Sequence, residues 1–277
     1  MSIEDNIHLF RHHAMATEFQ VRIADQEQKY AAQTAYACFE EISSVEKLLS
    51  RFRSDSEICH IANLAAGEFL RLTDTTFACL SLARYFEEWT RGAFSATARM
   101  GADGLQRWQL GEDFNIVCND PPVQMDLGAI GKGYALDRCA NILAEWGCPA
   151  FMLVAGGSSI LAGEAPAGMA GWNVGLGDET VKARWWMRHG SLSGSGVAVQ
   201  GQHIIDPRTG QPANVRHRAW AFAARAAMTD ALSTAAMVLS AEEIAEIMKD
   251  RKEARVILGD NGVVTTRGNW AMPQEVG

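Results

Sequence analysis

Residues 126–138 place a carboxylate, glycines and a lysine where a strand would give way to a helix. Asp126 and Gly128 are followed by Gly131 and Lys132, and then by a helical pattern of apolar residues. Glycines let a ligand approach the backbone closely, and exposed N–H groups at a helix start, together with one ammonium group, bind phosphate well. The segment indicates a phosphate site, although a plain strand–turn–helix junction with a surface lysine has the same composition.

Residues 229–234 offer oxygen ligands for a hard cation. Asp230 and Thr234 are four positions apart, so they lie on one face of a helix. Mg²⁺ typically takes one or two protein oxygens and completes its shell with substrate phosphates and water. The pattern fits a magnesium site, and it equally fits a helix start in which Thr229 is the N-cap and the Asp230 carboxylate interacts with the helix dipole.

In residues 203–212 a histidine precedes a short apolar strand that ends in a turn. His203 stands before Ile204 and Ile205, and the next five residues, Asp-Pro-Arg-Thr-Gly, have the composition of a β-turn. A histidine that titrates near neutral pH can deprotonate a hydroxyl nucleophile. A lone histidine is more often structural, so this segment alone leaves both roles open.

The common nucleotide-binding motifs are not matched. The P-loop pattern fails around Gly131-Lys132, because residue 126 is Asp and residue 133 is Gly rather than Ser or Thr. The pairs Gly175/Gly177 and Gly194/Gly196 lack the third glycine of a dinucleotide fingerprint. The commonest nucleotide folds are therefore disfavoured.

Composition limits the remaining functions. The chain has 277 residues, 48% of them hydrophobic and 21% charged, with a net charge of -8. An acidic chain lacks the basic face of a general nucleic-acid binder and the polybasic patch that holds proteins at membranes, so we expect neither nucleic acid nor membrane as a partner. The six cysteines show no zinc-ligand spacing, and we expect them to be free thiols.

The pattern along the chain predicts where the domain lies. Residues 1–13 are polar and include no apolar signal segment, and no run of 18 apolar residues follows, so we expect a cytoplasmic protein. We expect residues 1–14 to form a polar arm and residues 15–277 a single domain. No internal repeat or low-complexity linker divides that part of the chain.

Periodicity predicts helices in both halves and strands mainly in the second. Helices are expected over residues 29–52, 74–89, 130–146, 229–239 and 241–249. Strands are expected over residues 18–24, 151–154, 159–162, 172–176, 203–205, 219–223, 255–258 and 263–265. This order predicts an α+β (mixed α/β) fold in which β-sheets pack against helices.

The three segments occur in an order that resembles the ApbE family of FAD:protein FMN transferases. Residues 126–138 are similar to Asp-Leu-Gly-Gly-Ile-Ala-Lys-Gly-Tyr-Ala-Val-Asp-Arg, residues 203–212 to His-Ile-Ile-Asp-Pro-Arg-Thr-Gly-x-Pro, and residues 229–234 to Ala-Asp-Ala-Leu-Ala-Thr. Weaker similarities lie at Met15-Ala16-Thr17, at residues 49–58 and at residues 154–158. The resemblance covers nearly the whole chain and implies the fold of that family.

The resemblance also implies a role for individual residues. It implies a magnesium site made by Asp230, Thr234 and the backbone carbonyl of Ala129. It implies that His203 is the catalytic base that activates a Thr or Ser hydroxyl of an acceptor protein, with AMP as the leaving group.

A further set of residues would bind FAD, which is the substrate. The resemblance assigns this set to Met15, Phe52, Ala93, Phe94, Ser95, Asp126, Lys132, His203 and Ile204.

Some positions depart from the family pattern. Ser95 stands where the family usually has Asp, Phe52 where Tyr is common, and Ser158 where an Asp ends the Ala-Gly-Gly-Asp turn. Two alternatives to flavin transfer therefore stay open at this point. One is a non-catalytic FAD-binding relative that acts as a flavin reservoir or scaffold, and the other is a Mg²⁺-dependent hydrolase that converts FAD to FMN and AMP.

Overall fold

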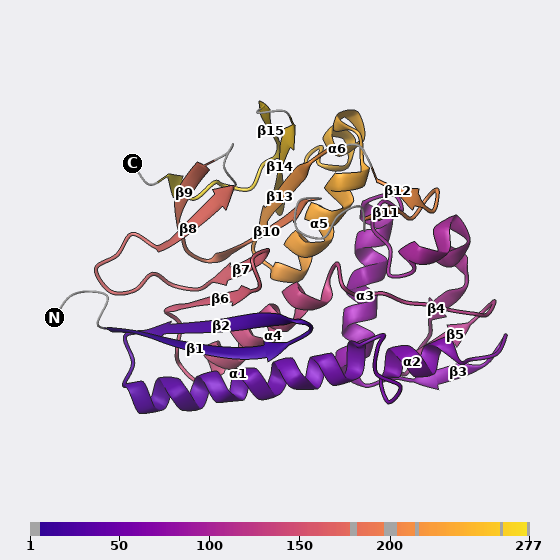
Figure 1. Cartoon of the computed structure of the whole chain (residues 1–277), viewed down its shortest axis with the longest axis horizontal. Coiled ribbons are helices and arrows are strands. Elements are labelled where there is room, and N and C mark those ends of the chain that lie inside the picture. The colour runs from indigo at the N-terminus through magenta and orange to yellow at the C-terminus, as the bar shows by residue number, and fades with distance from the viewer. Residues whose placement is uncertain (1–5, 178–181, 197–203, 214–215, 261–262, 276–277) are drawn as a thin grey trace.

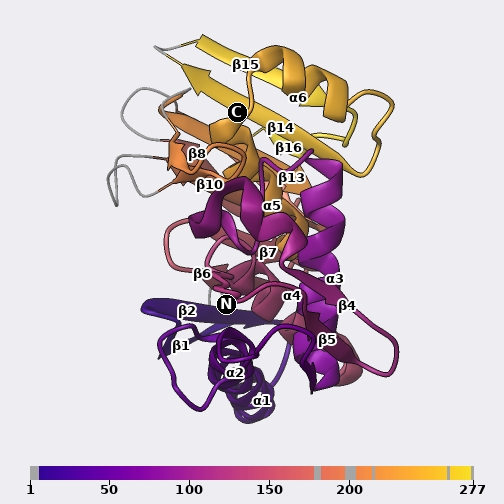
Figure 2. The same ribbon diagram turned by 90° about the vertical axis from the view of Figure 1, so that its right-hand side faces the viewer.

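One eight-stranded antiparallel sheet organises the chain in a computed structural model that describes residues 6–177, 182–196, 204–213, 216–260 and 263–275. Its strands follow the order β1-β2-β6-β7-β10-β13-β14-β15. Figure 1 shows the N-terminal hairpin at one end of the sheet and β14 with β15 at the other, and Figure 2 shows the same arrangement from the side. The strands are Ile7–Ala14, Thr17–Ala24, Phe151–Ala155, Ser159–Ala162, Gly190–Gly196, Arg218–Ala223, Ala254–Asp260 and Val263–Gly268.

Helices α1, α4 and α5 pack on one face of this sheet, and α3 packs against α1 and α5. The helices are α1 Gln28–Leu49, α2 Glu57–Ala62, α3 Asp74–Trp89, α4 Gly131–Glu145, α5 Ala226–Val238 and α6 Ala241–Ile247, with a 3-10 segment at Ala98–Gln106. The other strands form three smaller sheets. One contains β3 Phe69–Arg71, β4 Trp108–Leu110 and β5 Asn115–Cys118, and a second contains β8 Trp172–Gly177, β9 Lys182–Met187 and β16 Gln274–Glu275. The third pairs β11 Ile205–Asp206 with β12 Gln211–Pro212.

The strand β13 shows how the two faces of the sheet differ. Ala219 and Ala221 belong to the core between sheet and helices, whereas Trp220 and Phe222 belong to a second core that includes residues of β8 and β9. Successive side chains of a strand point to opposite faces, so small residues on one face let α5 approach closely. Large aromatic residues fill the space on the other face, where the rings of Phe222 and Trp185 meet at 5.4 Å.

The expected α+β class is confirmed, and most expected elements lie close to their predicted positions. Residues 74–89 form α3, with Thr73 as its N-cap. The helix expected over 29–52 ends earlier, at Leu49, where Ser50 adopts extended dihedral angles. All six cysteines are free, as expected. In the described parts of the chain, no helix is both long and apolar enough to cross a membrane.

Two further expectations differ from the structure. Residues 7–14 were expected in a polar arm, but they form β1 and pair with β2 from Ile7 to Ala14, so this segment is part of the sheet. β1 is an edge strand of the sheet, where charged side chains are common because they discourage pairing with another chain. The alternative in which Thr229 is an N-cap is wrong, because α5 begins at Ala226 with Arg225 as its N-cap.

Candidate functional site

The site begins where the N-termini of α4 and α5 cross. A Cβ atom at Gly133 would lie 2.1 Å from the carbonyl oxygen of Ala226, so only glycine permits this crossing. Asp137 of α4 accepts hydrogen bonds from the backbone N–H groups of Ala226, at 2.7 Å, and Ala227, at 3.0 Å. These groups have no partner within a helix, and a carboxylate there also interacts favourably with the helix dipole. Asp137 thus fixes the start of the helix that carries residues 229–234.

Asp230 forms the reciprocal contact from α5 back to α4. Its Oδ2 accepts the backbone N–H of Gly133 at 2.7 Å, and its Oδ1 accepts the hydroxyl of Ser159 at 2.6 Å. The side chain is nearly buried, because the residue is only 5% exposed. The structure therefore joins two of the segments singled out in the sequence, residues 126–138 and 229–234, through one carboxylate.

Asp137 and Asp230 lie near each other, and their environment affects how they titrate. Burial is the main cause that raises the pKa of Asp137 to about 6, against the hydrogen bonds from Ala227 and Ala226. The negative charge of Asp230 is a smaller contribution in the same direction. A cation close to these two carboxylates would relieve that repulsion.

Thr234 lies one turn after Asp230 and is half-buried. Its hydroxyl is 3.3 Å from the hydroxyl of Ser195 on β10, which also lies 3.0 Å from that of Ser233. Further along the same strand, the hydroxyls of Ser191 and Ser193 meet that of Thr229 at 2.8 and 2.9 Å. A row of hydroxyl groups thus fills the space between β10 and α5.

The oxygen atoms of Asp230, Thr234 and Ala129 are of the chemical type that Mg²⁺ prefers. Each oxygen of the Asp230 carboxylate makes one hydrogen bond and retains a further lone pair. Thr234 adds an alcohol, and Ala129 stands half-buried just before α4. No group of three or more His, Cys, Asp or Glu in the described residues could hold a metal. A set of few protein oxygens is typical of Mg²⁺, which takes the remaining ligands from phosphate and water.

Asp126 and Lys132 meet at Gly128. Asp126 Oδ1 accepts the N–H of Gly128 at 3.0 Å, and the Lys132 ammonium donates to the Gly128 carbonyl at 3.3 Å. Asp126 Oδ2 also pairs with Arg51 and Arg99, each with its Nε at 3.1 Å. The Asp126 carboxylate is thus held between two guanidinium groups, and Lys132 brings an ammonium group to the same turn before α4.

Phe52 is the exposed aromatic residue of the expected FAD set. Its side chain is 81% exposed, and the guanidinium of Arg51 lies 4.1 Å from the centre of its ring. Arg51 therefore links Phe52 to the group formed by Asp126, Arg51, Arg99 and Lys132, which we call the Asp126 cluster. The exposed ring of Phe52 leaves an aromatic face available to a ligand.

Ala93, Phe94 and Ser95 are buried, with exposed fractions of 1%, 2% and 5%. The Phe94 ring packs edge-on against Phe86 in the core. These three residues of the expected FAD set therefore lie in the core, while Phe52 lies at the surface.

The remaining expected residues lie at the ends of strands. Met15 occupies the β1–β2 turn with a φ of 50°, and its N–H donates to Glu46 of α1 at 2.6 Å. Ile204 is buried, and its carbonyl accepts the N–H of Ala213 at 2.8 Å. His203 lies outside the described residues.

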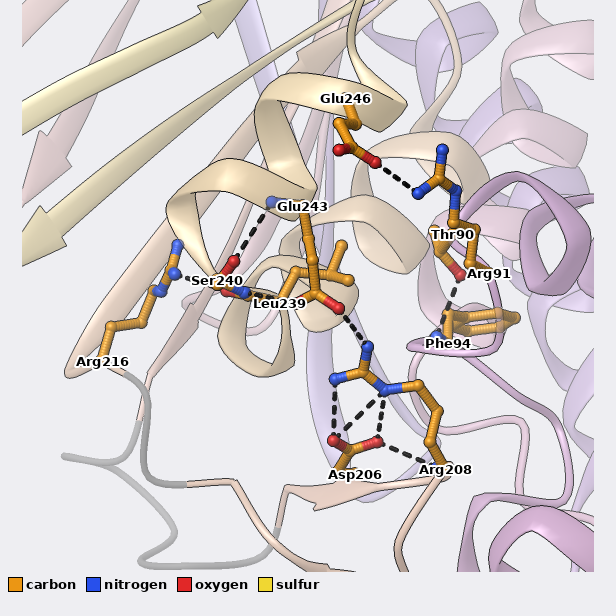
Figure 3. Close-up of polar contacts among 10 residues, drawn as sticks. All are labelled: Thr90, Arg91, Phe94, Asp206, Arg208, Arg216, Leu239, Ser240, Glu243 and Glu246. Carbon is orange, nitrogen blue, oxygen red and sulfur yellow. Dashed lines mark hydrogen bonds and ion pairs between the residues drawn. The ribbon is translucent and has the colours of Figure 1, made fainter.

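Arg208 anchors the turn that follows Ile204 (Figure 3). It contacts both oxygens of Asp206, with Nη2 at 2.9 Å from Oδ2, and reaches Glu243 of α6 at 2.6 Å. Glu243 also belongs to the capping box of α6 with Ser240. Burial is the largest influence on the pKa of Asp206 and acts to raise it, but the hydrogen bonds from Arg208, together with its positive charge, bring that pKa below its ordinary value. The Asp-Pro-Arg-Thr-Gly turn is thereby tied to the C-terminal helix.

Comparison with known proteins identifies the family of this chain. The sequence profile of the ApbE family matches residues 15–113 and 96–258. The chain belongs to the ApbE family. The FAD:protein FMN transferase of Treponema pallidum is 27% identical to this ApbE protein over 80% of the chain and 76% of its own length.

Other relatives align over shorter segments. Proteins named FAD:protein FMN transferase from Klebsiella pneumoniae and Escherichia coli are each 26% identical, over 65% and 56% of this chain. The aligned segment spans about half the length of these two relatives, 55% and 47%.

Solved structures of the family have the same fold. The flavin transferase ApbE from Vibrio cholerae superposes with a TM-score of 0.83 at 18% identity and covers 94% of this chain and 96% of its own. The ApbE protein from Thermotoga maritima gives 0.81 at 22% identity, with 95% and 97% covered.

Three residues at the site were not singled out by sequence reasoning. Ser159 binds Asp230, Asp137 caps α5, and Ser195 meets Thr234. Asp137 lies inside the segment 126–138, so the motif contained it without indicating its role. Ser159 and Ser195 gave no signal, because serine is common and their partners are distant in the sequence.

Proposed function

We propose that this protein is a Mg²⁺-dependent transferase that moves the FMN part of FAD onto a Thr or Ser hydroxyl of an acceptor protein and releases AMP. The observation that carries the proposal is the bond from Asp230 to the start of α4, which brings a metal-binding type of carboxylate next to Lys132. Membership of the ApbE family, and the names of its relatives, support the same activity.

Asp230, Thr234 and the Ala129 carbonyl would hold the metal. When bound, Mg²⁺ would neutralise charge on the pyrophosphate, and Lys132 would add a second positive charge at the same end of α4. The acceptor oxygen forms a bond to the FMN phosphorus while the bond from that phosphorus to the AMP oxygen breaks. Positioning and charge neutralisation dominate such displacements. His203 would take the proton of the attacking hydroxyl.

The flavin and adenine groups would lie along the surface marked by Phe52 and the Asp126 cluster. Phe52 offers an exposed ring for stacking, and Arg51 and Arg99 hold Asp126 in place beside it. Met15 and Ile204 would contribute from the ends of their strands, and Ala93, Phe94 and Ser95 from beneath the surface.

Replacement of Asp230 tests the proposal. We expect Asp230→Asn to reduce AMP release from FAD by about 100-fold or more at fixed Mg²⁺, because removing a group that stabilises developing charge typically has this effect. Asp74→Asn is the matched control, since Asp74 is an exposed carboxylate in the first turn of α3. Full activity of Asp230→Asn would refute the metal assignment. AMP release without any acceptor would identify a hydrolase, and FAD binding without AMP release a non-catalytic relative.

A further inference from the structure

A series of hydroxyl groups leads from Thr234 to the backbone of α5. Ser195 stands near the end of β10, which packs on α5. Its Oγ lies 3.3 Å from the Thr234 hydroxyl and 3.0 Å from the Ser233 hydroxyl. The Ser233 hydroxyl in turn donates to the backbone carbonyl of Asp230 at 3.1 Å. Three hydroxyl groups thus share three contacts, one proton for each.

The direction of these hydrogen bonds follows from the number of protons. A hydroxyl group has a single proton to donate and two lone pairs with which to accept. Ser233 uses its proton on the Asp230 carbonyl, because a carbonyl can only accept. The contact between Ser195 and Ser233 therefore takes its proton from Ser195. Ser195 then has no proton left for Thr234, so Thr234 is the donor in the remaining contact.

This direction suits a threonine that is to bind a metal ion. A Thr234 hydroxyl that donates to Ser195 keeps both lone pairs of its own oxygen available. Hydrogen bonds in a series polarise one another, so the donation also increases the electron density on the Thr234 oxygen. Histidine ligands of metals donate their second N–H to another protein group in the same way, which fixes their orientation and makes them better ligands. The opposite direction would use one Thr234 lone pair to accept the Ser195 proton.

The sheet holds Ser195 in place for this contact. Ser195 pairs with Ala219 of β13 in the antiparallel register. The preceding residue, Gly194, donates its N–H to the Ser158 carbonyl at 2.8 Å, just before β7 begins. β10 is therefore held on both sides close to Ser195. A side chain on such a rigid strand orients its partner more precisely than a side chain on a loop does.

We propose that Ser195 is a positioning residue that accepts the proton of Thr234 and thereby presents the Thr234 lone pairs to the metal ion. This inference rests on the proposed function, in which Asp230 and Thr234 hold Mg²⁺. Ser195 acts through Thr234 and does not itself bind the metal. Its loss should therefore weaken metal binding and leave kcat at saturating Mg²⁺ close to that of wild type.

Replacement of Ser195 by Ala tests this role through the binding of Mn²⁺, which takes the same oxygen ligands as Mg²⁺ and has an EPR signal. We expect Ser195→Ala to raise the Kd for Mn²⁺ about tenfold, the usual size of the effect when a group that orients a metal ligand is lost. Ser195→Thr keeps the hydroxyl and should retain the wild-type Kd. Ser81→Ala is the matched control, because Ser81 of α3 is half-buried and donates to a backbone carbonyl, that of Phe77, at 2.8 Å. A wild-type Kd in Ser195→Ala would overturn the proposal.

A second substitution tests the direction of the series. Without the Ser233 oxygen, the Ser195 proton is free to turn toward Thr234, so we expect Ser233→Ala to raise the Kd for Mn²⁺ as well. In the double variant of Ser195→Ala and Ser233→Ala the series is already interrupted at Ser195. Its Kd should therefore equal that of Ser195→Ala alone. Additive losses in the double variant would contradict the positioning role, because they would show that the two serines contribute independently.

The metal-binding data keep this inference distinct from the proposed function. If wild-type protein binds no Mn²⁺, the proposed metal site fails. If wild type and Ser195→Ala bind Mn²⁺ equally well, the role of Ser195 alone fails. In the AMP-release assay, Ser195→Ala should raise the KM for Mg²⁺ about tenfold with kcat nearly unchanged, and a fall in kcat at an unchanged KM would contradict a role in metal binding.

Neutron diffraction from metal-free crystals grown in D₂O shows the direction of the hydrogen bonds without any metal. We expect the deuterium of the Thr234 hydroxyl to lie on the line to Ser195 Oγ, and the deuterium of Ser195 on the line to Ser233. A Ser195 deuterium directed at Thr234 would refute the proposal.

Discussion

Asp137 should make the stability of the metal-free protein fall as the pH rises from about 4 to about 6. Its carboxylate caps α5 and is largely buried, which raises its pKa from the ordinary value of 3.8 to about 6. The folded protein therefore binds a proton more tightly than the unfolded chain between these two values. The stability that the protonated form contributes is fully present below about pH 4, declines between about pH 4 and about pH 6, and is lost above this window.

The size of the effect follows from the two pKa values. A shift of about 2 units, at roughly 1.4 kcal/mol each, corresponds to about 3 kcal/mol in the free energy of unfolding. Asp137→Asn keeps the size of the side chain and cannot titrate. The difference in unfolding free energy between wild type and Asp137→Asn should therefore change by about 3 kcal/mol between pH 4 and pH 7, in favour of the variant at pH 7.

Urea denaturation of both proteins at pH 4, 5.5 and 7, in the presence of EDTA, measures this difference directly. Other carboxylates titrate in the same range, but they are common to both proteins and cancel. Parallel pH profiles would refute the reasoning, because they would show that the hydrogen bonds from Ala226 and Ala227 cancel the cost of burying the charge.

Two further substitutions test the packing around the site. Gly133→Ala should lower the free energy of unfolding by about 3 kcal/mol or more, because the added Cβ would clash with the Ala226 carbonyl. Gly131→Ala in the same helix is the control, because a Cβ there meets open space and should leave the free energy of unfolding nearly unchanged. A denaturant titration of both variants measures the difference. Arg208→Ala should lower the free energy of unfolding by about 1 kcal/mol, because the contacts to Asp206 and Glu243 are lost. Arg208→Lys should recover little of this loss, because lysine lacks the planar guanidinium group that contacts both partners. Equal melting temperatures for wild type and both variants would show that these ion pairs contribute nothing.

The sequence predicted those helices and strands whose formation depends on residues close together in the chain. The helix at 74–89 has an N-cap threonine and a helical apolar pattern, and both operate within a few residues. The strand β10 was not predicted, because Gly-Ser-Leu-Ser-Gly-Ser-Gly has no apolar alternation. Its serines face hydroxyl groups of α5, a reason that only the folded chain shows.

The same distinction holds for the site. The segments around Asp126 and Asp230 were predicted as candidates from residue type and spacing. Their contact, between Gly133 and Asp230, joins residues 97 positions apart and has no local signature. The pairing of Asp126 with two arginines and the burial of Ser95 and Phe94 likewise depend on tertiary packing.

In the proposed reaction, an acceptor hydroxyl, rather than water, receives the FMN phosphorus. The direct measurement is the intact mass of an acceptor protein after incubation with this enzyme, FAD and Mg²⁺, together with quantification of AMP in the same sample. We expect the acceptor to gain the mass of one FMN residue through a phosphodiester bond, and one AMP to appear for each modified acceptor. AMP in excess over an acceptor of unchanged mass would contradict it.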